Sequence, residues 1–507
     1  MIHPPSIHIH NTTSSHVAPP PSTLISIDEA IELLGYGRFQ IRVLVAAGLC
    51  FAADAMEVLL LSFLSVVLQS LWELTSEQTA ILTSIVFLGQ FTGTLVLGPM
   101  GDRIGRRPVF LVSAIIITVF GMATAFCNTF TGLVIVRFLV GFGVGGLTVP
   151  FDILAELLPI EHRGRDLLFI EYFWTFGTLL VPVAAYVTLG NEANADHDNE
   201  NGWRYFVVLC AVPCLLSTII GTYYVPESPR WLLTVGKADQ AMEILRKGAI
   251  TNNLDPYTIF PEGMMLKAEA PEASNVKDLF SPAWRWITIN LWIAWAGFAF
   301  LYYGTILTTT LIFSQSAEDT EASDAYSFDY GAIFISGSAE VFGTTFAIVL
   351  IDRIGRVPVQ MISFSMGGLC MMLLSVFHNM DDGPRSALVA FAFFARFFMM
   401  AGNITTWVAT AEILTTEIRT TGHSCANACA RLGGFCAPYV VQQSTPPLAI
   451  GGLMLALSLV TTMAVRTLPE TKGKVLGLHP NHPEHQNAAT ELTSQAPDKA
   501  IKLESAA

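Results

Sequence analysis

The sequence predicts an all-α membrane protein whose twelve transmembrane helices form two pseudo-symmetric six-helix bundles. The chain of 507 residues is 52% hydrophobic and only 13% charged, whereas soluble domains carry roughly 25% charged residues. Twelve apolar stretches reach the length that crosses a bilayer, about 17 to 25 residues. The segment GDRIGRRPV at 101–109 recurs as IDRIGRVPV at 351–359. A charged loop repeated between apolar stretches is typical of a duplicated membrane bundle.

The apolar stretches divide the chain into five predicted regions. Their centres lie near residues 56, 89, 118, 142, 177, 213, 297, 340, 368, 398, 432 and 457. A long polar segment separates the sixth stretch from the seventh and marks the boundary between the duplicated halves. We therefore expect a cytoplasmic tail at 1–40, a first bundle at 41–225, a cytoplasmic linker at 226–283, a second bundle at 284–467 and a cytoplasmic tail at 468–507.

A short amphipathic helix is predicted just before the first apolar stretch. Ser26 and Glu29 have the spacing of a capping box, which marks a helix start. Ile27, Ile31 and Leu34 then recur on one helical face. We expect this helix to lie along the inner membrane surface.

Charged residues are sorted between the two sides of the predicted bundle. Lysine and arginine concentrate in alternate loops and in the C-terminal tail, while the opposite loops are acidic. The positive-inside rule places the basic loops in the cytosol, so both termini should be cytosolic. The formal net charge of −14 would suggest a basic partner, but the distribution of the charges matters more than their sum. We expect a lipid bilayer and no nucleic acid around the chain. The plasma membrane is the expected location, with a vesicle or other endomembrane as the alternative.

Several motifs carry a family resemblance that covers about residues 26–476. The chain resembles the major facilitator superfamily through GPMGDRIGRR at 98–107. Further segments are similar to its sugar and organic-ion branch: AELLPIEHRGR at 155–165, PESPRWL at 226–232 and LPETKG at 468–473. The resemblance implies a secondary transporter.

Other segments narrow the resemblance within that branch. They are similar to synaptic-vesicle-2-related proteins, plant organic cation/carnitine transporters and bacterial niacin transporters: IDEAIELLGYGRFQ at 27–40, ADAMEVLLLSF at 53–63 and KDLFSPAWRW at 277–286. The seventh stretch has NLWIAWAGFAFLYYG at 290–304 in place of the glutamines and asparagine of sugar-binding relatives. This difference argues against a sugar substrate.

The duplicated loop and the motif that follows it predict a charged cytoplasmic gate. Glycines let helix ends approach closely, and acids pair with arginines to hold the inner face shut. The expected members are Gly98, Asp102, Arg103, Gly105, Arg106, Arg107, Glu156, Arg163, Asp352, Arg353, Arg356, Glu412 and Arg419. Breaking this network should bias the protein between inward-open and outward-open states. The alternative is that these charges only set the topology.

Two acids lie near the middle of the first span. A charge at this depth costs at least about 2.5–3.5 kcal/mol, so it points to a site or a partner. Asp54 and Glu57 are three residues apart on one helical face. The family resemblance implies that Asp54 pairs with Arg137 of the fourth span and couples proton movement to transport. The alternatives are a fixed ion pair between these spans and, for Glu57, either a cation ligand or a packing acid.

The second half has its own charges at membrane depth, Glu340, Arg396 and Arg431. Arg431 is suited to bind a carboxylate by a two-pronged hydrogen bond. That would fit an anion such as nicotinate, in line with the resemblance to niacin transporters. The alternative is that Arg431 neutralises Glu340 or Glu57 permanently.

An aromatic cluster in the seventh span is the remaining candidate for the substrate site. Flat apolar walls with polar edges hold planar or cationic ligands by stacking. The candidates are Trp292, Trp295, Tyr302 and Tyr303, with Asn403 and Asn427 as hydrogen-bonding groups. Packing is the alternative role for each aromatic residue taken alone.

The features together predict a proton-coupled secondary transporter of a small organic ion, nicotinate-like or cationic. It should work as a monomer by rocking two bundles about a midplane site. The alternatives are an uncoupled organic cation facilitator that uses Asp54 and Glu57 as ligands, and a non-transporting sensor or vesicle protein of the same fold. We expect no enzyme, cofactor or metal site, because the sequence lacks a nucleophile-base group, a phosphate-binding loop and metal-ligand spacing.

Overall fold

Long helices occupy every apolar stretch of the sequence. The computed structural model describes residues 24–190, 201–267, 276–315, 328–380, 383–443 and 445–472. Within these ranges eleven helices are long and apolar enough to cross a membrane. One further long helix, α16 (Thr416–Val441), occupies the eleventh stretch. It is more polar than the others because it carries His423, Asn427 and Arg431.

The first half of the bundle contains the first six stretches. Its helices are α2 (Arg38–Leu71), α3 (Ser76–Ile104), α4 (Arg106–Ala123), α5 (Phe130–Val144), α6 (Thr148–Leu157), α7 (Ile160–Leu189) and α8 (Gly202–Tyr224), with the 3₁₀ turn η1 (Thr124–Phe126). The fourth stretch is divided into α5 and α6 at Gly145 and Gly146. A Cβ on Gly145 would lie 2.4 Å from the Gln90 carbonyl oxygen, so the break packs directly on α3.

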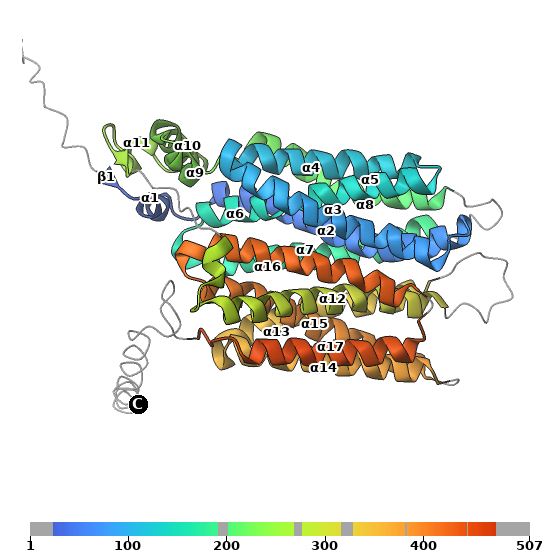
Figure 1. Cartoon of the computed structure of the whole chain (residues 1–507). Coiled ribbons are helices and arrows are strands. Elements are labelled where there is room, and N and C mark those ends of the chain that lie inside the picture. Colours follow the sequence, from blue (N-terminus) through green and yellow to red (C-terminus); the bar gives the residue numbers. More distant parts are fainter. Residues whose placement is uncertain are drawn as a thin grey trace, which may run out of the picture.

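The second half repeats this arrangement. Its helices are α12 (Arg285–Gln315), α13 (Tyr330–Ile354), α14 (Arg356–His378), α15 (Arg385–Ile413), α16 and α17 (Pro447–Arg466). The halves lie side by side with their helices roughly parallel (Figure 1). They meet where α16 packs against α3, α7 against α13 and α12 against α2. We call the end that carries the α3–α4 and α13–α14 connections the basic end.

Glycines let helix backbones touch at equivalent places in the two halves. A Cβ on Gly177 of α7 would lie 2.3 Å from the Ala52 carbonyl oxygen of α2. A Cβ on Gly433 of α16 would lie 2.1 Å from the Ala296 carbonyl oxygen of α12. Small residues at helix crossings permit this close packing in membranes. The paired contacts indicate that the internal repeat extends to the packing of the helices.

A small folded unit, which we call the clasp, lies at the basic end (Figure 1). It comprises residues 24–37 and 226–267. Its elements are β1 (Leu24–Ile25), α1 (Ile27–Leu34), α9 (Pro229–Thr234), α10 (Ala238–Thr251), α11 (Pro256–Ile259) and β2 (Met265–Leu266). The 3₁₀ turn η3 (Val276–Phe280) then leads to α12. β1 and β2 pair in parallel, which joins the N-terminal segment to the linker.

The amphipathic helix exists as predicted, but its expected position on the membrane surface is wrong. Ser26 and Glu29 form the capping box, with hydrogen bonds of 3.2 and 2.8 Å. Ile27 and Ile31 are fully buried, and α1 packs against α10 of the linker. The apolar face therefore contacts protein, because the linker provides its own apolar surface.

Gly141→Ala tests the closest helix approach of the first half. A Cβ there would lie 2.1 Å from the Val86 carbonyl oxygen, so α3 and α5 must separate. We expect a loss of about 1–3 kcal/mol of stability, as is usual for overpacking, measured as a lower melting temperature of the purified protein. Gly452→Ala is the control, because nothing lies within 4 Å of its Cβ position. Equal melting temperatures for the two variants would contradict the packing.

Candidate transport site

A buried ion pair joins α2 and α5 in the first half. Arg137 is fully buried, pairs with Glu57 and donates a 3.1 Å hydrogen bond to the Thr124 hydroxyl. The expected contact between Asp54 and Arg137 is therefore wrong. Asp54 lies about 4.5 Å nearer the basic end along α2, and Glu57 is the acid at the level of Arg137. The proposed role of Asp54 and Arg137 in proton coupling stays a prediction.

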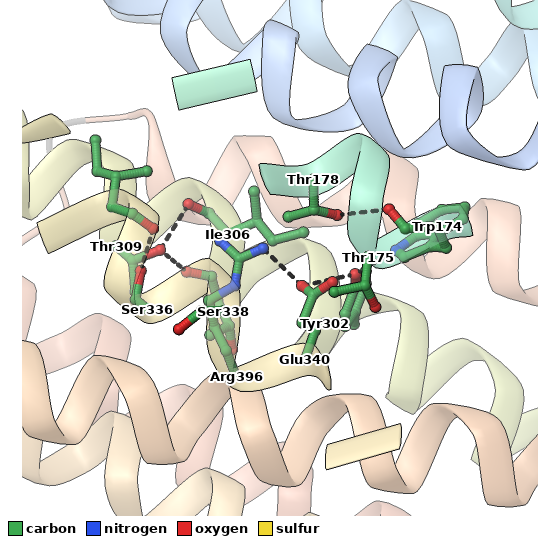
Figure 2. Close-up of polar contacts among 12 residues, drawn as sticks. Trp174, Thr175, Thr178, Tyr302, Ile306, Thr309, Ser336, Ser338, Glu340 and Arg396 are labelled. Carbon is green, nitrogen blue, oxygen red and sulfur yellow. Dashed lines mark hydrogen bonds and ion pairs between the residues drawn. The ribbon is translucent and has the colours of Figure 1, made fainter. Parts of the chain in front are cut away.

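A second buried pair lies in the second half and reaches across to the first (Figure 2). Arg396 donates to Glu340 at 2.6 Å, and the Tyr302 hydroxyl donates to the same carboxylate oxygen at 3.0 Å. The Trp174 indole of α7 donates to the Tyr302 hydroxyl at 2.7 Å. This chain of contacts connects α7 of the first half with α12, α13 and α15.

A third group of polar residues comes from both halves, and we call it the central cluster. It consists of Asp54, Gln90, Tyr303 and Arg431. Arg431 donates to the Gln90 amide oxygen at 2.7 Å and approaches the Tyr303 hydroxyl at 3.4 Å. Asp54 is 5% exposed, interacts electrostatically with Arg431, and has one carboxylate oxygen without a hydrogen-bond partner in the described chain. The alternative in which Arg431 neutralises Glu340 or Glu57 is thus wrong.

Gln90 was missed by the sequence reasoning, although the repeat contains a signal for it. The loop repeat has an offset of 250 residues, and the same offset aligns GQFTG at 89–93 with AEVFG at 339–343. Gln90 therefore holds in α3 the place that Glu340 holds in α13. One half therefore has a neutral amide, which accepts from Arg431, where the other has an acid.

Aromatic residues of the second half lie at two depths. Tyr302 and Tyr303 belong to the clusters described above. Trp295 lies closer to the basic end, where its indole donates to Thr410 at 2.8 Å. Trp292 packs edge-on against Phe280 of η3, at 5.4 Å between ring centroids, away from the central cluster.

The two halves are in contact at both ends of the bundle. At the basic end Phe151 lies 6.2 Å from Trp407, and at the opposite end Phe63 lies 4.8 Å from Phe328, measured between ring centroids. A cavity of about 360 Å³ lies between the halves toward the opposite end. The Gln442 amide donates to the Ser65 hydroxyl beside it, at 2.9 Å. The halves therefore touch on both sides of the central cluster.

The charged loop of the first half forms a network with two members that were not predicted, Asp152 and Glu227. Arg106 contacts Asp152 at 2.9 Å, Glu156 at 3.1 Å and Asp102 at 3.7 Å. Glu227 accepts from the Arg106 backbone N–H at 2.8 Å.

Other predicted gate residues of this loop have separate roles. Glu227 also accepts from the Arg107 backbone N–H at 3.0 Å, and the Arg107 side chain donates to the Thr222 carbonyl at 2.7 Å. Gly105 has φ +110°, which permits the turn, whereas Gly98 has nothing within 4 Å of its Cβ position. Arg103 is exposed.

The second half has a matching network. Arg356 donates to Glu412 at 2.7 and 2.8 Å and contacts Asp352 at 3.3 Å. Glu470 accepts from the backbone N–H groups of Arg356 and Val357, as Glu227 does in the first half. Glu227 and Glu470, neither of which was predicted, each follow a proline after the last span of a half, in PESP and LPET.

The remaining gate candidates lie beside these networks. Arg353 accepts a hydrogen bond from Lys472 through its carbonyl, and Arg419 donates to the Leu414 carbonyl at 3.3 Å. The side chain of Arg163 falls outside the described residues. Each network described here lies within one half, so the expectation that one network joins the halves is wrong for these residues.

Glu470 makes the second network sensitive to pH. Burial raises the pKa of this carboxyl, but hydrogen bonds from four backbone N–H groups outweigh burial and hold the pKa below its usual value. A depressed pKa means that the ionised form stabilises the folded state above the unfolded value of about 4.3. This contribution is lost as the pH falls through the folded value.

Glu470→Gln should therefore lower the melting temperature at pH 7, by the equivalent of about 1 kcal/mol. The difference from the unsubstituted protein should shrink as the pH falls below about 4. Melting curves between pH 3 and pH 8 measure this, with Glu262→Gln, an exposed glutamate, as the control. A difference that does not change with pH would contradict the assignment.

The partner of Arg137 can be tested by double substitution. Arg137→Met leaves Glu57 buried without its partner, and we expect a loss of about 3–5 kcal/mol. Adding Glu57→Met should restore most of the stability, because an apolar pair of similar volume replaces the ions. Adding Asp54→Asn should not. Thermal unfolding compares the variants, and rescue by Asp54→Asn would contradict the observed pairing.

Comparison with known proteins identifies the family. The family described as Sugar (and other) transporter matches residues 46–480. The Synaptic vesicle 2-related protein of Pongo abelii is 30% identical over 462 residues, which cover 88% of this chain and 79% of that protein. Organic cation/carnitine transporter 7 of Arabidopsis thaliana is 30% identical over 458 residues, covering 83% of this chain and 88% of that protein.

A solved structure has the same fold. The partially occluded inward-open conformation of the xylose transporter XylE from E. coli matches with a TM-score of 0.66 at 21% identity, over 86% of this chain and 100% of that chain. The predicted all-α fold is thereby confirmed. The chain is a multi-pass membrane transporter that belongs to the sugar (and other) transporter family of the major facilitator superfamily.

Proposed function

We propose that the protein is a proton-coupled transporter of a small organic acid, such as nicotinate, that works by alternating access. The observation that supports this function is the central cluster. Its residues come from α2 and α3 of one half and from α12 and α16 of the other. A ligand held there contacts both halves, as a site for alternating access requires.

Arg431 is the proposed carboxylate ligand. Arg137 and Arg396 each pair with a buried carboxylate, whereas the hydrogen bonds of Arg431 go to the neutral Gln90 and Tyr303. Its Nε has no hydrogen-bond partner within the described residues. Arginine binds carboxylates through two parallel N–H groups. The Nε–H of Arg431 is one N–H group that a substrate carboxylate would accept from.

Asp54 is the proposed proton carrier. Asp54 interacts electrostatically with Arg431. A substrate carboxylate on Arg431 neutralises that positive charge, and Asp54 is then left ionised in a medium of low dielectric. Protonation of Asp54 removes this cost, so the substrate and a proton enter the site together.

The contacts between the halves suit a rocking motion. The arginine networks at the basic end each lie within one half and keep their contacts when the halves move. Hydrogen bonds that cross the interface, such as those of Gln90 with Arg431, Trp174 with Tyr302 and Gln442 with Ser65, involve neutral groups on at least one side. Such bonds break and form at a lower cost than buried ion pairs.

An uncoupled carrier of organic cations is the second candidate. The name of the Arabidopsis relative favours it. One carboxylate oxygen of Asp54 has no hydrogen-bond partner among the described residues and is able to bind a cation. Glu57 is unsuited to the same role because Arg137 occupies it. The name of the synaptic-vesicle relative supports a vesicle membrane as the location beside the expected plasma membrane.

Uptake of labelled nicotinate into proteoliposomes, with and without an imposed pH gradient, tests the proposal. We expect the gradient to drive accumulation. Arg431→Lys should reduce uptake at least about tenfold, because lysine cannot form the two-pronged contact. Asp54→Asn should abolish the response to the gradient while retaining exchange of nicotinate.

Arg42→Lys is the matched control, since Arg42 is exposed and contacts Tyr224 at the basic end. Choline is the comparison substrate. Choline uptake that ignores the gradient and is lost in Asp54→Asn would establish the cation carrier instead.

A further inference from the structure

One face of α16 carries a row of polar side chains from the central cluster toward the basic end. His423, Asn427 and Arg431 are spaced four residues apart and therefore lie above one another on the helix. Each has a buried polar atom without a hydrogen-bond partner among the described residues: Nε2, Nδ2 and Nε, respectively. Asn427 is 1% exposed and Arg431 is 8% exposed. Buried polar groups are normally paired, so three in a row indicate a ligand path.

Two indole rings form a wall beside this row. The His423 ring lies 5.2 Å from Trp295 and 4.9 Å from Trp407, and the two indoles lie 4.9 Å apart, all measured between centroids. The hydrogen bond to Thr410 holds the Trp295 ring in place. Asn403, one turn from Trp407 on α15, is 8% exposed and has an unpaired amide oxygen.

The first half approaches this region through Phe151. Phe151 of α6 lies 6.2 Å from Trp407 across the interface between the halves. The region lies between the central cluster and the basic end. Separation of Phe151 from Trp407 would open it on that side.

We propose that Asn427, His423, Trp295 and Trp407 form a release subsite for a small planar acid on its way from Arg431 to the basic end. This inference rests on the proposed function and adds a second position for the same substrate. Asn427 and Arg431 offer N–H donors, which suit carboxylate oxygens. The indoles offer flat faces and edges, which suit an aromatic or heteroaromatic ring.

The spacing makes a stepwise transfer feasible. Four residues of α-helix rise about 6 Å, which is comparable with the length of a small aromatic acid. A carboxylate that leaves Arg431 therefore meets Asn427 after one turn and His423 after two. Loss of Asn427 or His423 should slow release and leave binding at Arg431 almost unchanged.

Transport and binding measured on the same purified full-length variants test the subsite. The probe is nicotinate, and cyclohexanecarboxylate is the non-planar acid for comparison. We expect Asn427→Ala and His423→Ala to slow nicotinate transport into proteoliposomes at least about tenfold, the effect of one lost hydrogen bond to a charged group. The calorimetric Kd for nicotinate should change less than about threefold. Trp407→Leu should reduce the preference for nicotinate over cyclohexanecarboxylate.

Two controls separate a substrate contact from a structural role. Ser424→Ala changes the exposed neighbour of His423 on the same helix and should transport normally. Asn427→Gln keeps the amide donors and should recover part of the lost rate.

Each result has a distinct meaning. If nicotinate is transported and Asn427→Ala and His423→Ala match Ser424→Ala, the subsite is wrong and the proposed function stands. If both Asn427 variants slow transport equally and lower the melting temperature, Asn427 is structural and the subsite is again wrong. If the unsubstituted protein transports neither acid, the proposed function itself is wrong.

Discussion

The cost of keeping charge inside a membrane governs the centre of this protein. Two buried arginines form ion pairs with a carboxylate from a neighbouring helix: Arg137 with Glu57 and Arg396 with Glu340. These pairs hold α2 to α5 and α13 to α15. Arg431 lacks such a hydrogen-bonded acid in the described chain and interacts electrostatically with Asp54 of the other half. This imbalance is the basis of the proposed site for a substrate and a proton.

The contacts within each half differ in kind from the contacts between the halves. Each of the described arginine networks at the basic end lies within its own half. Glu227 accepts from backbone N–H groups at the start of α4 in the first half, and Glu470 does so at the start of α14 in the second. Between the halves the structure has aromatic contacts and hydrogen bonds to neutral groups. Each half is thus held more firmly than the interface between them. A motion that repacks the interface and preserves the halves follows from this difference.

The clasp links the connection between the halves to the first half. Trp231 donates to the Asp102 carbonyl at 2.8 Å, and Ser228 donates to Glu156. Arg230 contacts Asp28 of α1 at 2.6 Å, which brings in the N-terminal segment. The linker therefore contacts the same loop network that we assign to the gate.

Composition, apolar length and the internal repeat were sufficient to predict the helices and the duplication, and short motifs such as GPMGDRIGRR carried the resemblance to the family. These features depend on local sequence, because a membrane span needs only an apolar stretch of the right length. The repeat, extended to Gln90 and Glu340, also contained the asymmetry of the central residues. The partners of the charges depended on packing. Whether Asp54 or Glu57 faces Arg137 depends on how α2 and α5 are aligned in depth, and two acids on one helical face do not reveal this alignment. The contact surface of α1 likewise required its distant partner, because an apolar face fits a membrane and a protein equally well until α10 is placed against it.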